Sequence, residues 1–380
     1  MDFNFSDIKY ITEDVHSNLL KRSQLQENDL LMTITGRIGT CAVVNKECLP
    51  GNINQHIVRI RLKPGYNPQF VAAFLNSDMG LLLSNRGVTG TTRIALDYES
   101  IKKIPIPNIT NQSKQLYYIT IIDAARKKKN RMIEQADEEL QSHLLNIQDI
   151  LNLKNPTRKK FYFAIKFSNL DGVIDAKRYV NLHNKLAERN VSDVCEVIDS
   201  KVNVSSYKDR EVDWISIDDL PNQPVDIAQV RTMPASEIDG TFFEVQKNDI
   251  LVARLGPTIL NQKIVMVRHI ERTTIASAEF LVLRCKEGYN PEAVMAILKT
   301  PYYRDLMYSH ARGSTPSRYR LNREDMLKLP FPDITDTQTQ IANNAIEVRN
   351  KVVSLRIEAE QEWKAAKEQF EKELLGETNE

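Results

Sequence analysis

Two long segments of the chain carry apolar residues at the three- and four-residue spacing of a helix. From Ser113 to about Leu151 there is no glycine or proline, and the recurring positions include Leu116, Ile119, Ile133, Leu140 and Leu144. In the second segment they are Ile341, Ala345, Val348, Val352, Leu355 and Ala359. Such a stripe predicts a helix that packs against another helix. At 1.5 Å per residue, a helix of about 38 residues is roughly 57 Å long, so the pair would be a rigid spacer.

Shorter patterns predict strands and helices outside these segments. Between Asp29 and Val44, apolar residues are interleaved with Thr33, Gly36 and Gly39, which is typical of short strands joined by a glycine-containing turn. The stretch from Ile250 to Val267 has the same pattern, with Gly256-Pro257 at the turn. Asn67-Pro68 and Asn290-Pro291 each combine a polar cap with a first-turn proline, and predict helices near 69–84 and 292–308.

The chain is an internal repeat. Gln26-Glu27-Asn28-Asp29-Leu30-Leu31 returns at 246–251, the Gly-Tyr-Asn-Pro of 65–68 returns at 288–291, and Ile104-Pro105-Ile106-Pro107 returns as Leu329-Pro330-Phe331-Pro332. A period of more than 200 residues is too long for a solenoid, so each copy must be a domain with its connector. We therefore expect a first domain at 1–110, a first spacer helix at 111–152, a second domain at 153–335, a second spacer helix at 336–376 and a tail at 377–380.

Each predicted short helix is followed by a loop rich in arginine and hydroxyl residues. Arginine forks, hydroxyls and free backbone amides are the donors that bind phosphates and base edges. The alternative is a solvated turn whose arginines form local salt bridges. The candidate DNA-binding residues are Arg86, Thr89, Thr91, Thr92 and Arg93 in the first loop, and Arg312, Ser314, Thr315, Ser317, Arg318, Tyr319 and Arg320 in the second. The turns at 33–37 and 255–262 are weaker candidates, and the basic run 126–131 is either a solvated helix face or a DNA contact.

Charge and motifs limit the chemistry. With 51 basic and 50 acidic residues the net charge is +1, which is weak for a protein that binds DNA by electrostatics alone. The sequence has no Asn/Asp-Pro-Pro-aromatic loop, no glycine-rich phosphate loop and no close histidine or cysteine ligand set, so we assign it no catalytic residue, no metal and no cofactor of its own. Its apolar runs are too short for a membrane span and its start has no signal pattern, so we expect a cytoplasmic protein.

Two copies of this motif order, each ending in a long heptad helix, closely resemble the specificity (S) subunit of type I restriction-modification enzymes. The resemblance covers nearly the whole chain and depends on the paired organisation more than on any one motif. It implies an α+β fold, with two mixed α/β target recognition domains separated by two long antiparallel coiled-coil helices. Each domain would read one half of a split sequence in double-stranded DNA.

The resemblance also implies partners. Two methyltransferase (M) subunits would dock on the helices and a restriction (R) subunit would join them, so S-adenosylmethionine, ATP and Mg²⁺ would be bound by those subunits. The candidate partner-binding positions on the helices are Leu116, Ile119, Ile133, Leu140, Ile341, Val348, Val352 and Leu355.

One departure from the family pattern concerns the first domain. About 90 residues precede the Gln246 segment in the second copy, whereas 25 precede Gln26 in the first, so we expect the first recognition domain to be N-terminally shortened. This leaves a second function open, in which the chain is a coiled-coil interaction adaptor that no longer reads DNA. Salt-sensitive, sequence-dependent binding to duplex DNA would distinguish the specificity subunit from the adaptor.

Overall fold

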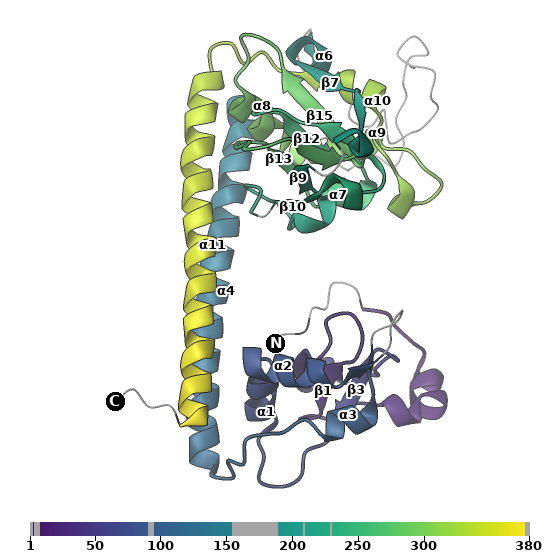
Figure 1. The fold of residues 1–380 in the computed structure, drawn as a ribbon, viewed down its shortest axis with the longest axis vertical. Helices are drawn as coiled ribbons and strands as arrows, with labels where there is room; N and C mark the ends of the chain where they lie inside the picture. Colours follow the sequence, from purple (N-terminus) through teal and green to yellow (C-terminus); the bar gives the residue numbers. More distant parts are fainter. Residues whose placement is uncertain are drawn as a thin grey trace. The chain divides into compact units, whose positions relative to one another are not determined.

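The computed structural model describes residues 3, 8–89, 95–153, 189–207, 210–228 and 230–376. The chain divides into two compact units, the first comprising residues 1–133 with 357–380 and the second residues 134–356. Both apolar stripes are helical, as predicted: they form α4 (Gln112–Ile150) and α11 (Gln338–Leu375). Because the division falls inside these helices, each unit contains part of α4 and part of α11 (Figure 1).

The two long helices run antiparallel in each unit. In the first, Lys128 and Lys129 of α4 pair with Glu362 and Glu360 of α11 at 2.8 and 2.7 Å, and Tyr118 packs edge-on against Phe370. In the second, Arg356 of α11 pairs with Asp137 of α4 at 2.8 Å, and Lys351 pairs with Glu139. Residues later on α4 thus meet residues earlier on α11, which confirms the predicted antiparallel pairing. Lys128 and Lys129, in the basic run, already have carboxylate partners.

The first unit is built on a three-stranded antiparallel sheet in the order β2-β1-β3. Its strands are β1 (Leu30–Thr33), β2 (Cys41–Val43) and β3 (Ile57–Ile60). Its other elements are η1 (Val15–Leu19), η2 (Lys21–Ser23), η3 (Lys46–Cys48), α1 (Pro68–Leu75), α2 (Asp78–Arg86), β4 (Val88–Thr89), β5 (Ala95–Leu96) and α3 (Tyr98–Lys102). One face of the sheet packs on α1 and on both long helices, so Leu30, Met32, Phe70, Tyr118 and Phe370 share one core.

The second unit contains two main sheets. The strand order is β13-β12-β15-β7 in one and β10-β9-β14-β11-β8 in the other. The first sheet consists of β7 (Cys195–Ile198), β12 (Ile250–Ala253), β13 (Ile264–Met266) and β15 (Phe280–Cys285). The second consists of β8 (Lys201–Asn203), β9 (Glu211–Ile215), β10 (Arg231–Pro234), β11 (Thr241–Glu244) and β14 (Thr274–Ser277).

Short helices and a small ladder complete the second unit. They are β6 (Arg189–Asn190), α6 (Val191–Val194), η5 (Val204–Tyr207), η6 (Ile217–Asp219), η7 (Ala235–Glu237), α7 (Gly256–Leu260), α8 (Pro291–Leu298), α9 (Pro301–His310), η8 (Pro316–Arg318), α10 (Arg323–Leu327) and β16 (Pro330–Phe331), which pairs with β6.

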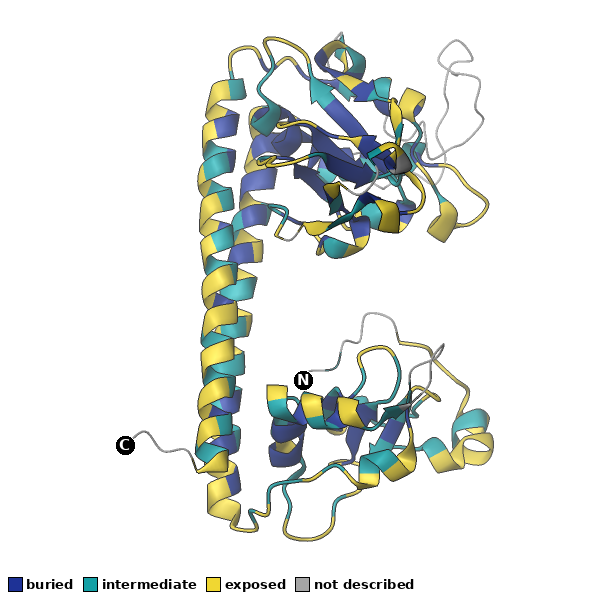
Figure 2. Cartoon of the chain, viewed as in Figure 1, coloured by how far each residue is buried: buried dark blue, intermediate teal, exposed yellow. Residues whose placement is uncertain are grey.

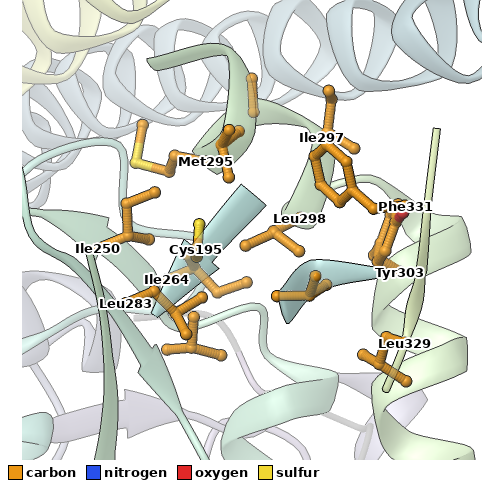
Figure 3. Close-up of a cluster of buried hydrophobic side chains, with 14 of the residues drawn as sticks. Cys195, Ile250, Ile264, Leu283, Met295, Ile297, Leu298, Tyr303, Leu329 and Phe331 are labelled. Atoms are coloured by element: carbon orange, nitrogen blue, oxygen red, sulfur yellow. The ribbon is translucent and has the colours of Figure 1, made fainter. Parts of the chain in front are cut away.

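The four-stranded sheet is buried on both faces (Figure 2). Ile250 and Val252 of β12 face the helices, where they join Leu283, Ile297, Leu298 and Phe331 (Figure 3). The alternate residues Leu251 and Ala253 face the second sheet and join Phe243 and Val282. Side chains alternate across a strand, so a strand that is apolar at every position must be covered on both sides.

The predicted helices at 69–84 and 292–308 are each two helices. The first breaks after Leu75 and restarts at Asp78, because the Ser77 side chain accepts the Gly80 N–H. The second breaks after Leu298, and Thr300 caps α9 ahead of Pro301. The predicted turn at Gly256-Pro257 is likewise wrong, since these residues open α7, with the proline in its first turn.

A buried carboxylate organises the same turn in both units. Asp249 accepts the Gln246 N–H at 2.7 Å and binds Arg284 through two hydrogen bonds of 2.8 Å. Asp29 accepts the Gln26 N–H at 2.8 Å and the Arg61 Nε at 2.8 Å. The residue before each is an asparagine in the left-handed region, with φ of 70° at Asn28 and 72° at Asn248. The repeated Gln-x-Asn-Asp segment is therefore a hydrogen-bonded turn that starts the central strand.

Glutamines at the starts of the long helices bind the Gly-Tyr-Asn-Pro loops. Gln115 of α4 donates to the Gly65 carbonyl at 2.7 Å and accepts the Asn67 N–H at 2.6 Å. Gln338 of α11 donates to the Gly288 carbonyl at 3.1 Å and accepts the Asn290 N–H at 2.9 Å.

The C-terminal part of the other long helix caps a short helix in each unit. Glu371 of α11 accepts the Met79 N–H at the start of α2 at 2.6 Å. Gln148 of α4 accepts the Tyr302 N–H at the start of α9 at 2.7 Å. Each unit is thus attached to the beginning of one long helix and to the end of the other.

The units differ in their second layer. Strands β8 to β11 precede the repeated Gln246 turn and β14 lies between β13 and β15. Among the described residues of the first unit, the sheet that corresponds to β13-β12-β15 has no fourth strand and no second sheet against it. The N-terminal shortening of the first domain stays a prediction.

Replacing Asp249 by asparagine should lower the stability of the second unit by about 2 kcal/mol, because a neutral amide binds Arg284 more weakly than a buried carboxylate does. Asp29→Asn should act in the same direction on the first unit. Hydrogen exchange of the full chain should show faster exchange only in the unit that carries the change. The exposed Asp336→Asn serves as the control, and equal effects in both units would contradict this account.

Candidate DNA interface

The second arginine loop is closed at its base by paired backbone hydrogen bonds. The Arg312 N–H donates to the Arg320 carbonyl at 3.0 Å, and the Arg320 N–H donates back at 2.8 Å. The loop between them contains η8, whose end is fixed where the Arg318 N–H donates to the Thr315 carbonyl at 2.8 Å. The loop backbone therefore has a defined conformation.

Two glycines allow this loop to pack tightly. A Cβ on Gly313 would collide with the Arg318 carbonyl oxygen, and a Cβ on Gly256 would lie 2.8 Å from the Pro316 oxygen. The Gly256 N–H instead donates to the Tyr319 carbonyl at 2.7 Å, and the Leu321 N–H donates to the Arg254 carbonyl at 2.9 Å. The loop thus lies against the start of α7, which brings together two candidates that the sequence placed 60 residues apart.

Carboxylates hold two of the three predicted arginines. Arg312 pairs with Asp325, which is 4% exposed, at 3.1 Å, and Arg320 pairs with Glu279 at 2.7 Å. Both arginine side chains stay about half exposed. A guanidinium has five N–H donors, so donors remain for a phosphate or a base edge. Arg318 is exposed and has no ion pair among the described residues.

The remaining predicted residues of this loop divide by exposure. Ser314, Thr315 and Ser317 are exposed, and the hydroxyls of Thr315 and Ser317 lie 3.2 Å apart. Tyr319 is half buried, with its ring 6.0 Å from that of Tyr308. Tyr319 therefore supports the loop, whereas the hydroxyls and Arg318 are available to a ligand.

In the first unit, the structure describes only part of the predicted loop. Arg86 is exposed in the last turn of α2, and β4 pairs with β5 at the base of the loop. Thr91, Thr92 and Arg93 lie outside the described residues, as does the side chain of Thr89. The Leu96 N–H donates to the Ile34 carbonyl at 3.1 Å, so the loop base lies beside the 33–37 turn, as the second loop lies beside α7.

Both loops contain an Arg-Gly pair, at 86–87 and at 312–313, but these pairs do not occupy corresponding positions in the two units. Thr89 pairs with Ala95 and Arg312 pairs with Arg320, each beside the leucine that bonds back to the central hairpin. Thr89 therefore corresponds to Arg312, and Arg86 corresponds to Ser309. Arg86 and Arg312 therefore do not correspond, because Arg86 lies in the last turn of α2, whereas α9 ends at His310 and Arg312 lies in the β-bridge.

The structure also distinguishes the predicted partner-binding residues on the helices. Leu140 and Val352 are buried between α4 and α11, with Val348 and Leu355 packed partly against them. Ile341 is buried in the core of the second unit, and Ile119 packs on the core of the first. Ile133 is half buried, and Leu116 is 54% exposed. Of this set, only Leu116 presents most of its side chain to a partner.

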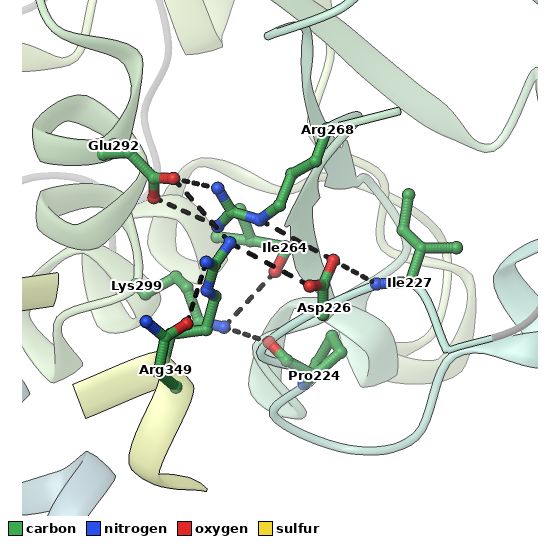
Figure 4. Close-up of polar contacts among 9 residues, drawn as sticks. Pro224, Asp226, Ile227, Ile264, Arg268, Glu292, Lys299 and Arg349 are labelled. Atoms are coloured by element: carbon green, nitrogen blue, oxygen red, sulfur yellow. Dashed lines mark hydrogen bonds and ion pairs between the residues drawn. The ribbon is translucent and has the colours of Figure 1, made fainter. Parts of the chain in front are cut away.

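A cationic cluster that the sequence did not reveal lies beside α11 in the second unit (Figure 4). Arg268 binds Glu292 through both guanidinium ends, and Arg349 of α11 lies 4.0 Å from Glu292 and from Asp226. Lys299 is buried, and its Nζ donates to the carbonyls of Pro224 and Ile264. Burial, with Arg356 and Arg268 nearby, lowers the pKa of Lys299 to about 7.

Lys299 occupies the position of Asn76 in the first unit. Asn76 ends α1 and donates to the Cys41 carbonyl at 2.8 Å, as Lys299 ends α8 and donates to Ile264. The longer lysine side chain also donates to the Pro224 carbonyl. Pro224 lies in a loop that has no counterpart in the described part of the first unit. Lys299 therefore joins α8 to the region that precedes the repeat.

One family model matches the first part of the chain. Residues 5–135 match the family model described as the type I restriction modification DNA specificity domain. Residues 5–135 are thus similar to this DNA specificity family. The matched residues include the sheet of the first unit, Arg86 and the first part of α4. The second unit repeats its buried carboxylate, its glutamine contact and its helix cap.

Solved structures of type I systems are similar to the chain at low identity. A structure that addresses complex assembly and conformational transition of the type I R-M system matches at 13% identity, over 92% of this chain and 81% of that chain, with a TM-score of 0.46. The type I S subunit from M. genitalium matches at 12% identity, over 93% and 84%, with a TM-score of 0.41. The HsdS subunit from Thermoanaerobacter tengcongensis matches at 13% identity, over 91% and 81%, with a TM-score of 0.32. These similarities are too low to establish a fold alone, and no curated protein matches the sequence.

No helix in the described part of the chain combines the length and the apolar character needed to cross a bilayer.

The stability of the second unit should rise with pH between about 7 and 10.5 because of Lys299. In that window the unfolded lysine holds its proton while the buried amine has released it, so the unfolded state binds more protons. The slope from one such group is at most about 1.4 kcal/mol per pH unit. Urea unfolding at several pH values should show this slope in the unmodified chain and a flatter profile in Lys299→Asn, which copies Asn76. Parallel profiles would contradict the assignment.

Proposed function

We propose that this chain is the DNA specificity subunit of a type I restriction-modification complex, and that its two units read the two halves of a split DNA sequence. The observation that carries the proposal is the specificity-domain match over the first copy, together with the second copy's repetition of its hydrogen-bonded turns and caps. A protein with two copies of a DNA-reading domain is suited to a bipartite target.

The second arginine loop is the best-supported reading element. Its backbone is held by the Arg312–Arg320 bridge and by Gly256, while Arg318 and the hydroxyls of Ser314 and Ser317 are exposed. A fixed loop with free donors loses little conformational freedom on binding. Arg312 and Arg320 are constrained by their carboxylates, so we assign them to positioning the loop and to phosphate contacts, and Arg318 to the direct contact with a base.

The chain has a scaffolding role in the proposed complex. Two methyltransferase subunits would dock along α4 and α11, and a restriction subunit would join them. The transferred methyl group, ATP hydrolysis and Mg²⁺-dependent cleavage would belong to those subunits. Exposed apolar side chains on the helices support this assignment, with Leu116 54%, Tyr117 53% and Ile357 52% exposed in the first unit and Leu145 50% exposed in the second.

Arg318→Ala should weaken binding of the assembled complex to its target duplex by about 1–3 kcal/mol. A guanine contact would relax the preference at one base pair, whereas a phosphate contact would weaken all sequences alike and lower the salt slope by about one. Binding should be measured at several salt concentrations, with each half-site scrambled in turn.

The matched control for this experiment is Arg272→Ala, which removes a partly exposed arginine paired with Glu211 near the five-stranded sheet. Arg86→Ala in the first unit should have a smaller effect than Arg318→Ala, because Arg86 lies on a helix end rather than on a closed loop. Equal losses of DNA affinity from Arg318→Ala and Arg272→Ala would show that the loop does not contact DNA. Sequence-independent binding by the unmodified complex would contradict the proposed function itself.

Leu116→Asp should abolish co-purification with the methyltransferase subunit, because it places a charge on an exposed apolar position of α4. Asn130→Asp adds the same charge at an exposed polar position of the same helix and should leave the complex intact. Val352→Asp tests something else: Val352 is fully buried between the helices, so this change should unfold the pair. Normal complex formation by a folded Leu116→Asp chain would contradict the docking assignment.

A further inference from the structure

Two cysteines face each other across neighbouring strands of the second unit. Cys195 begins β7 and Cys285 ends β15, and the two residues are direct partners in the antiparallel ladder. Their Sγ atoms lie 3.6 Å apart, although the residues are 90 positions apart in the sequence. Both are free thiols, with Cys195 buried and Cys285 half buried. Cys195 is one of the labelled residues in the buried cluster of Figure 3.

The backbone hydrogen bonds identify the kind of pair that they form. The Lys286 N–H donates to the Val194 carbonyl at 2.8 Å, one residue beyond the cysteines on each strand. That pattern makes Cys195 and Cys285 a non-hydrogen-bonded pair, in which opposite Cα atoms lie about 4.5 Å apart. This spacing falls within the range of about 4.4–6.8 Å that a disulfide spans. Side-chain rotation alone could therefore bring the sulfurs to bonding distance.

We propose that Cys195 and Cys285 form a redox modification site, at which a peroxide-class oxidant converts the two thiols to a reversible disulfide between β7 and β15. This site is independent of DNA binding. The disulfide would join β7, which precedes the repeated part of the second unit, to β15, which belongs to the sheet common to both units.

The chemistry assigns different roles to the two thiols. The half-buried Cys285 reacts first: its thiolate attacks one oxygen of hydrogen peroxide, the O–O bond breaks, and hydroxide leaves and takes up a proton as water, so that Cys285 becomes a sulfenic acid. Cys195 then attacks that sulfur, the S–S bond forms, and the sulfenic oxygen leaves with a proton as a second water. One peroxide is thus reduced to two waters, and the two thiols are oxidised. The hydrogen bond to Cys285 and burial raise the pKa of the Cys195 thiol, which agrees with its role as the second thiol.

The first unit and the other cysteines supply matched controls. The residue that corresponds to Cys285 is Leu62, because Asp29–Arg61 corresponds to Asp249–Arg284. Cys285→Leu therefore copies a side chain that the repeat already accepts. Cys41 is buried against the Gly39 carbonyl, and Cys48 bonds to Asn45, so neither has a second sulfur beside it among the described residues.

The test uses the purified full chain at low concentration, treated with hydrogen peroxide and then unfolded for thiol counting. The count should fall from four to two, and peptide mapping should recover one cross-link, between Cys195 and Cys285. The Cys41→Ser/Cys48→Ser double variant should form the same cross-link, whereas Cys285→Leu and Cys195→Ala should not. Because the bond closes a long loop, the melting midpoint of the second unit should rise by roughly 5–15 °C on oxidation and return on reduction.

Two results would overturn the proposal. In the first, four thiols remain in the unmodified chain, or the cross-link involves Cys41 or Cys48. In the second, the Cys195–Cys285 bond forms but leaves the melting midpoint unchanged, which would remove its role as a link between the strands. Folding of Cys285→Leu is checked separately by its circular dichroism in the absence of oxidant.

Discussion

Each unit completes its hydrophobic core with side chains from both long helices. Tyr118 of α4 and Phe370 of α11 are buried in the first core, and Ile147 of α4 and Ile341 of α11 are buried in the second. Burying one such side chain contributes about 1.5–3 kcal/mol, so neither core is complete without the helices. The helices also pack on each other, through Tyr118 and Phe370 in the first unit and through Leu140 and Val352 in the second. Each unit therefore comprises a domain together with parts of both long helices.

The polar contacts make this arrangement specific. Gln115 and Gln338 bind backbone groups of a loop, and Glu371 and Gln148 cap a short helix, so each unit contacts the start of one long helix and the end of the other. An unpaired backbone group inside a core is costly, which restricts the helices to one axial position. The candidate reading loops follow directly after the capped helices α2 and α9. Their position is thus set by contacts to the helices on which we propose that partner subunits dock.

Much of the fold was predictable from local patterns. The central hairpins, the proline-capped starts of α1 and α8 and both long helices follow from periodicity and capping residues within a few positions. The breaks at Ser77 and Thr300 were missed, although each is a helix-capping residue, because apolar residues continue on both sides. The second sheet was also missed, since its strands are short and one of them, β14, comes from inside the repeat.

For the candidate site, the segment that carries arginines, hydroxyls and glycines could be identified from the sequence, because composition and repetition are properties of the chain. The tertiary structure places Asp325 against Arg312 and Glu279 against Arg320, and leaves Arg318 without an ion pair among the described residues. The same holds for the burial of Lys299 and for the pairing of Cys195 with Cys285 across neighbouring strands. These features depend on strand register and on contacts between residues up to 90 positions apart, and no local pattern encodes a register between distant strands.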